Sequence, residues 1–96
     1  MSILLCIYLH KKFRQEHLFE HYGINRYSFR PDLLKLGTVK MNYSKYREHG
    51  SIIISNNRYS SYDISMFSAQ GRLKHQICGV QRRDIASRVK QLMMYL

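Results

Sequence analysis

The sequence contains little cysteine and little proline, and it has no tryptophan. Its two cysteines, Cys6 and Cys78, are too few and too far apart for a secreted disulfide framework or a cysteine-based zinc site, so we expect a reduced, cytoplasmic setting. One proline and five glycines leave no linker or low-complexity segment. A chain of 96 residues fills one modest core. We therefore expect one ordered domain over residues 1–96.

Long apolar runs are also absent. The opening run from Ile3 to Leu9 has seven residues, whereas a membrane-spanning helix needs about 20. A signal peptide needs a positive region before such a run and a small-residue cleavage site after it, and the sequence has neither. We therefore expect no membrane partner. The run itself predicts a buried strand over residues 2–9, with the first turns of a helix as the alternative that periodicity does not exclude.

Acidic residues are scarce as well. Six Asp and Glu stand against sixteen Lys and Arg, which gives a net charge of +10. The excess is spread along the chain, and a protein with such a charge attracts phosphates. The sequence therefore predicts a nucleic-acid-binding protein, with DNA ahead of RNA. Scarce alanine beside abundant Ile, Lys, Ser and Tyr is the usage of AT-rich coding sequence, which points to a virus or mobile element.

The remaining pattern predicts the α+β class, with a small antiparallel sheet packed against a C-terminal helix. A helix is expected near residues 10–22, closed by Gly23 in the left-handed conformation. Residues 25–37 read mostly as loop, with at most one helical turn after Pro31. Alternating and β-branched residues predict four strands, near residues 38–43, 51–55, 59–67 and 72–79.

Two turns and one helix complete this expected fold. Asn56-Asn57 suits a tight hairpin turn between the second and third strands. Pairing Phe67 with Arg72 across the next turn places His75 on the core side and Arg72, Lys74 and Gln76 on the open face. A helix over residues 85–95, with Asp84 as its N-cap, is expected to cover strands 59–67 and 72–79.

The basic segment from Arg72 to Lys90 contains the predicted binding site. It holds six basic residues against Asp84 and includes a helix start, where guanidinium groups and free N–H groups both favour phosphate. The strand face offers three donors in a row to a groove of nucleic acid. The candidate nucleic-acid-binding residues are Arg72, Lys74, Gln76, Arg82, Arg83, Arg88, Lys90, Arg58, Lys45 and Arg47.

Aromatic rings could instead stack on unpaired bases. The rings most suited to this by position are those of Tyr43, Tyr46, Tyr59 and Phe67, each near a cation. A small core without tryptophan needs aromatic volume, so most of the rings are expected to pack inside.

Catalytic and metal signatures are weak, which favours a protein that is not an enzyme and has no cofactor. His17 and His21 have the spacing at which two imidazoles can share one ion, but the sequence places no third ligand, so we expect no metal. A metal-independent RNase-type toxin is one alternative, and it requires five side chains to converge. These are His49, His75, Arg72, Lys74 and Tyr59.

Another alternative function is a small inhibitor or adaptor that binds an acidic host protein or a nucleoprotein complex, since a basic patch serves that equally well. A homodimer is also conceivable, because the Ile-rich segment from Ser51 to Ser55 could pair edge to edge with a second copy.

Overall fold

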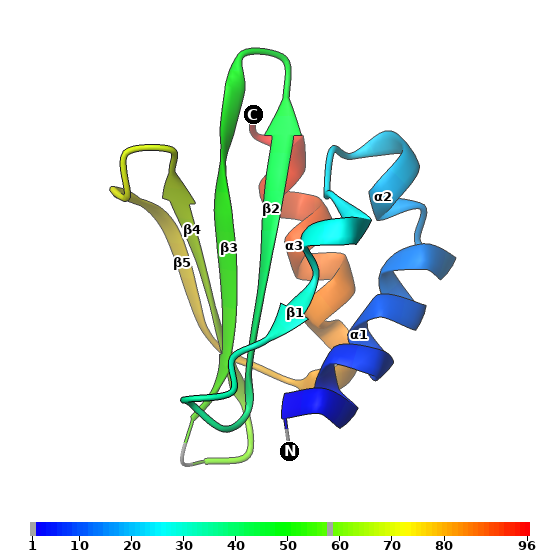
Figure 1. The fold of residues 1–96 in the computed structure, drawn as a ribbon, viewed down its shortest axis with the longest axis vertical. Helices are drawn as coiled ribbons and strands as arrows, with labels where there is room; N and C mark the ends of the chain where they lie inside the picture. The colour runs from blue at the N-terminus through cyan, green and yellow to red at the C-terminus, as the bar shows by residue number, and fades with distance from the viewer. Residues whose placement is uncertain (1, 58) are drawn as a thin grey trace.

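The computed structural model describes residues 2–57 and 59–96 and shows a five-stranded antiparallel sheet with helices on one face (Figure 1). The strands follow one another in the order β1-β2-β3-β4-β5, so the predicted α+β class is confirmed. In chain order the elements are α1 (Ser2–Gln15), α2 (Leu18–His21), a 3-10 turn (Arg26–Ser28), β1 (Arg30–Pro31), β2 (Thr38–Lys45), β3 (Glu48–Asn56), β4 (Tyr62–Ser68), β5 (Leu73–Val80), a second 3-10 turn (Arg82–Asp84) and α3 (Ile85–Met94).

The N-terminal segment is helical, so the strand expected over residues 2–9 is wrong and the alternative, the first turns of a helix, is confirmed. Leu5, Leu9 and Phe13 are buried and recur every fourth residue, which is the spacing of one side of a helix. Ile3 and Ile7 lie on the other side and are more than half exposed. No glycine or proline separates the apolar run from the basic residues after it, so one helix continues through both.

The helix expected over residues 10–22 is interrupted at His17. This residue has φ 58° and ends α1, and a single further turn forms α2. Gly23 has φ 84°, as predicted for the residue that closes the helix, and the N–H of buried Ile24 donates to the carbonyl of Leu18. The segment therefore comprises two helical pieces joined by one left-handed residue.

Strand boundaries differ from the expected ones at the turns. β2 and β3 extend past residues 43 and 51 because Tyr46, at φ 58°, allows a tight connection. The expected turn at Asn56-Asn57 is wrong, because β4 begins only at Tyr62. The Oδ1 atom of Asn57 accepts hydrogen bonds from the N–H groups of Tyr59 and Ser61 and so stabilises a longer loop. Residue 58 lies outside the described residues.

Pro31 begins no helical turn. Arg30 and Pro31 instead pair with Lys40 and Val39 and add the edge strand β1 to the sheet. Proline is tolerated at an edge strand because that position does not require its missing N–H.

The pairing of β4 with β5 corrects the expected register. Phe67 pairs with Leu73, Met66 with His75 and Ile64 with Ile77, with irregularities on both sides of the Ile64–Met66 stretch. A bulge inserts a residue that simple alternation does not count, and this shifts the pairing. His75 lies opposite buried Met66 yet is itself exposed.

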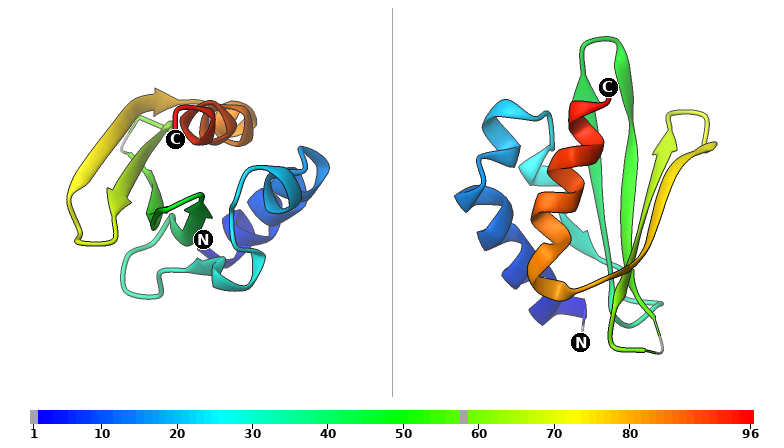
Figure 2. Two further views of the ribbon diagram at one scale, coloured as in Figure 1. Left: turned by 90° about the horizontal axis from the view of Figure 1, so that it is seen from above. Right: turned by 180° about the vertical axis from the view of Figure 1, so that it is seen from behind.

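The core lies between the sheet and two helices from opposite ends of the chain (Figure 2). Helix α3 buries Ile85, Val89, Leu92 and Met93, as its helical spacing predicted. It starts after Asp84, whose side chain makes no capping hydrogen bond. Of the two strands that it was expected to cover, it packs against β4, whereas β5 is left partly uncovered and its Leu73 is more than half exposed.

Strand β3 lies at the centre of the sheet and pairs along its length with both β2 and β4. Its backbone N–H and C=O groups are therefore already hydrogen-bonded to β2 and β4, which rules out edge-to-edge pairing of residues 51–55 with a second copy. Among the described residues no helix has the length and apolar content needed to cross a membrane.

Gly50 is required by close packing inside the sheet. A Cβ atom at this position would lie 1.9 Å from the carbonyl oxygen of Phe67 and 2.8 Å from the hydroxyl of Tyr43, which donates to that same oxygen.

We expect Gly50→Ala to lower the free energy of unfolding by about 1–3 kcal/mol through this overlap. Urea unfolding measures the change, and Ser51→Ala, on the open face, is the control expected to stay within about 0.5 kcal/mol. Equal stabilities of the two variants would contradict the packing.

Candidate nucleic-acid interface

The strand residues predicted to bind nucleic acid do not form one row. Arg72 precedes β5, in the turn after β4. Lys74 lies at the bulge and forms an ion pair with Glu48, whose hydrogen bond raises the pKa of the lysine. Gln76 donates to the hydroxyl of Ser65 at 3.1 Å on the open face. Because the bulge changes the alternation, the predicted row of three donors is absent.

The other cations of the sheet are also dispersed. The Nζ of Lys45 donates to the carbonyl of Met93 at 2.8 Å and so links β2 to α3. Arg47 lies in the exposed turn between β2 and β3. Lys40 pairs with Asp32 at 3.3 Å. Arg58 lies outside the described residues. The sheet side therefore carries its cations at separate hairpin turns or in pairs.

Helix α1 and the turn before α3 meet at the ring of Tyr8. The guanidinium carbon of Arg82 lies 4.0 Å from the centroid of this ring, and the Nζ of Lys12 lies 5.9 Å from it. Cations over an aromatic face are attracted by its negative quadrupole. Two basic segments that are 70 residues apart in the sequence are thus brought together at one side chain.

A second set of contacts joins the helices further along. Lys90 of α3 forms an ion pair with Glu16 at 3.7 Å, and its Nζ lies 5.3 Å from the ring centroid of Tyr22. These contacts hold α1 and α2 against α3. They also use one of the few acidic groups of the helical layer.

The helical layer consequently carries an excess of positive charge. Its acidic residues are Glu16, which pairs with Lys90, Glu20, which pairs with His17 and His21, and Asp84 at the start of α3. We name as the helical basic face the cations of α1 and of the segment that leads into α3, together with Lys90 of α3. These residues are Lys11, Lys12, Arg14, Arg82, Arg83 and Lys90.

Arg88 belongs to a different side of α3. It is exposed and lies two residues before Lys90, so the two side chains project about 200° apart around the helix axis. The sequence grouped both residues in one site. The structure places Lys90 towards α1 and Arg88 away from it.

Lys11, Lys12 and Arg14 were not among the predicted binding residues. The signal that could have identified them is the composition of residues 2–15, which include these three cations and no acidic residue. Because residues 2–9 were expected to form a strand, the three basic positions were not recognised as part of the same helix as residues 2–9. Their proximity to Arg82 follows only from helix packing.

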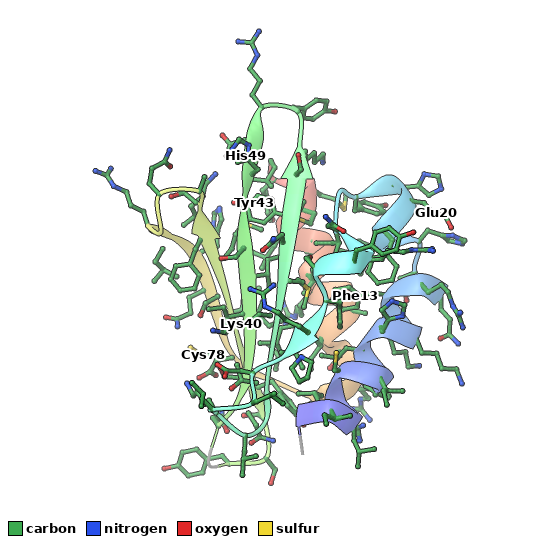
Figure 3. All side chains as sticks on the ribbon, in the orientation of Figure 1. Phe13, Glu20, Lys40, Tyr43, His49 and Cys78 are labelled. Carbon is green, nitrogen blue, oxygen red and sulfur yellow. The ribbon has the colours of Figure 1, made fainter. Side chains whose placement is uncertain are left out.

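The aromatic rings considered for base stacking are not gathered at the helical basic face. Tyr46 and Tyr59 are 87% and 80% exposed, but they lie in loops at opposite ends of the sheet (Figure 1). Tyr43 is buried, and burial raises its pKa (Figure 3). Phe67 is half-buried.

The five side chains required for RNA cleavage are not brought together either. Arg72 and Tyr59 belong to loops at opposite ends of β4. His75 pairs across from buried Met66, whereas His49 is exposed on β3 at a position that alternates with buried Ile52 and Ile54. The two histidines therefore lie on opposite faces of the sheet.

The chain matches no protein-family model, and comparisons with curated proteins and with solved structures give no significant match.

The contact between Tyr8 and Arg82 can be measured by a double-mutant cycle. Combining Tyr8→Leu with Arg82→Ala should reveal a coupling of about 0.5–1 kcal/mol in the free energy of unfolding, because either change alone removes the cation–π contact. Urea unfolding of the four proteins measures the coupling. Tyr8→Phe keeps the ring and should retain the coupling with Arg82. Purely additive effects of the two substitutions would contradict the contact.

Proposed function

We propose that this protein binds nucleic acid through the helical basic face. The observation that carries the proposal is the meeting of Lys12 and Arg82 at Tyr8, which joins the basic segments of α1 and of the turn before α3. Like charges repel, so gathering them on one surface is unfavourable unless an anion compensates them. A chain of phosphates is the anion that suits several cations spread over two helices.

The chemistry of the side chains agrees with a phosphate ligand. Arg82 and Arg83 belong to the 3-10 turn that leads through Asp84 into α3, where the helix dipole and the N–H groups of the first turn add a partial positive charge. Guanidinium groups can bind phosphate oxygens through two parallel hydrogen bonds. Lys11 and Lys12 supply point charges from the neighbouring helix. The arrangement suits contacts to a backbone and contains no evident device for reading bases.

Double-stranded nucleic acid is the preferred class in this proposal, with DNA ahead of RNA. Single-strand binding relies on rings that bases can cover. The ring of Tyr8 is already covered by Arg82, and exposed Tyr46 and Tyr59 lie away from the helical basic face. We place this activity inside the cell, in agreement with the low cysteine content.

Salt dependence tests the proposal. Labelled duplex DNA, single-stranded DNA and RNA are titrated with the protein at about 50 and about 200 mM salt, a range over which six to ten phosphate contacts would weaken binding by about 10³–10⁵. Two double variants each remove two cations of this face: Arg82→Ala/Arg83→Ala and Lys11→Ala/Lys12→Ala. Each should reduce the slope of the logarithm of the binding constant against the logarithm of the salt concentration by about 1.8, because each lost phosphate contact contributes about 0.9.

The matched control is Arg47→Ala/Arg72→Ala, which removes the same charge from two hairpin turns of the sheet side. This variant should keep the wild-type slope. If it alone lowers the slope, the interface lies on the sheet side and the helical basic face is not the site.

A second candidate function, binding of an acidic protein or nucleoprotein by a small inhibitor or adaptor, is supported by one specific observation. The exposed side of α1 begins with Ile3, Leu4 and Ile7, which are 53%, 62% and 62% exposed, and continues with Lys11 and Arg14. Apolar side chains followed by cations along one side of a helix suit an acidic protein surface. Absence of nucleic-acid binding even at low salt would make this the leading function.

A further inference from the structure

Three metal-ligating side chains converge where α1 meets α2. The Nδ1 atom of His17 lies 3.6 Å from Oε2 of Glu20, and the Nε2 atom of His21 lies 3.9 Å from the same oxygen. One ligand atom from each residue lies within 4.8 Å of the others. The sequence indicated the two histidines by their spacing, and the structure places the carboxylate of Glu20 beside them.

The backbone explains why these side chains share one side. His17 adopts the left-handed conformation that ends α1, and its carbonyl accepts the first hydrogen bond of α2 from the N–H of His21. Residues separated by three and four positions lie above one another on a helical turn. The imidazole rings of His17 and His21 consequently have their centroids 5.8 Å apart.

The turn that carries the ligands is fixed to the rest of the molecule. Leu18 is fully buried, and the ring of Phe19 packs against the rings of His10, Phe13 and Phe29. Glu20 lies on the side of α2 that faces away from the sheet (Figure 3). The ligands therefore project into solvent from an anchored backbone.

We propose that His17, Glu20 and His21 bind a divalent transition-metal ion, of which Zn²⁺ is the best match. Two imidazole nitrogens and one carboxylate oxygen form a ligand set used at zinc sites that keep a fourth position open. Imidazole favours Zn²⁺ over Ca²⁺ or Mg²⁺, which prefer oxygen ligands. Because the three side chains are exposed, water or a ligand from outside has access to the fourth position.

The distances require little adjustment. Ligand atoms around a tetrahedral Zn²⁺ with bonds of about 2.0–2.1 Å are separated by about 3.3 Å. The two separations from the carboxylate oxygen, 3.6 and 3.9 Å, are longer by about 0.3 and 0.6 Å, and the two imidazole nitrogens lie within 4.8 Å of each other. Side-chain rotation at an exposed site supplies such a shift without moving the backbone.

Local charge also favours a cation at this point of a strongly basic protein. Within the described part of the chain, the ion pairs of Glu20 are those with His17 and His21. Arg26, on the same part of the surface, lies with its guanidinium carbon 5.8 Å from the ring centroid of Phe19, and Lys90 is engaged by Glu16. The carboxylate is therefore shared only with two groups that are themselves ligands in their neutral form.

The test uses the full chain without an affinity tag and titrates it with Zn²⁺ by calorimetry. Wild-type protein should bind one ion, and Co²⁺ in its place should give the visible spectrum of a tetrahedral site. His17→Asn and His21→Ala should each weaken binding at least about tenfold, since loss of even an outer-shell partner weakens metal sites by that factor. Glu20→Gln should weaken it as well.

The variants are chosen so that folding and ligation can be separated. Asparagine tolerates the left-handed backbone of His17, so the change removes the imidazole and keeps the turn. Circular dichroism and thermal unfolding verify that each variant folds. His49→Ala removes an exposed histidine on β3 and should leave Zn²⁺ affinity unchanged.

Absence of one-to-one Zn²⁺ binding, or binding that is equally strong in the folded His17→Asn and His21→Ala variants, overturns the proposal. Equal losses in His49→Ala do the same, because they would show that exposed histidines bind the ion without a defined site. The salt dependence of nucleic-acid binding is a separate measurement, and its outcome does not decide this one.

Discussion

The structure depends on covering one apolar face of a five-stranded sheet. Strands β2, β3 and β4 alternate so that Met41, Ile52 and Ile64 point to the same side, and a sheet cannot leave such a face in water. One helix is too narrow to cover it, so α1 and α3 lie there side by side although they come from opposite ends of the chain. Every contact between the two basic segments follows from that packing.

The two surfaces of the molecule differ because only one of them is covered. The open sheet face carries small polar side chains, such as Ser51 and Ser65, and cations held in pairs such as Lys40 with Asp32. The helices bury their apolar sides and turn their charges outward, with few acids among them. Both parts of the chain carry an excess of Lys and Arg, seven against three acids in residues 1–25 and 81–96 and nine against three in residues 26–80. What distinguishes the helical layer is that Lys12 and Arg82 meet there at one ring.

His17 shows how one backbone conformation can create a local arrangement of ligands. Its left-handed geometry stops α1 and begins α2, so the residues that follow do not continue the outer surface of α1. Burial of Leu18 fixes the new turn, and its exposed side then presents His17, Glu20 and His21 together. The same device that closes the helix over the core thus produces the proposed metal site, apart from the helical basic face.

The sequence by itself determined the α+β class, the alternating strands and the apolar side of α3, because these depend on residue spacing within a single segment. It also determined the excess of positive charge. Only the tertiary structure decided that residues 2–9 are helical, that a bulge shifts the pairing around Lys74, and that Lys12 meets Arg82. Those features depend on contacts between segments distant in the chain, and a local pattern carries no information about which distant surface it will pack against.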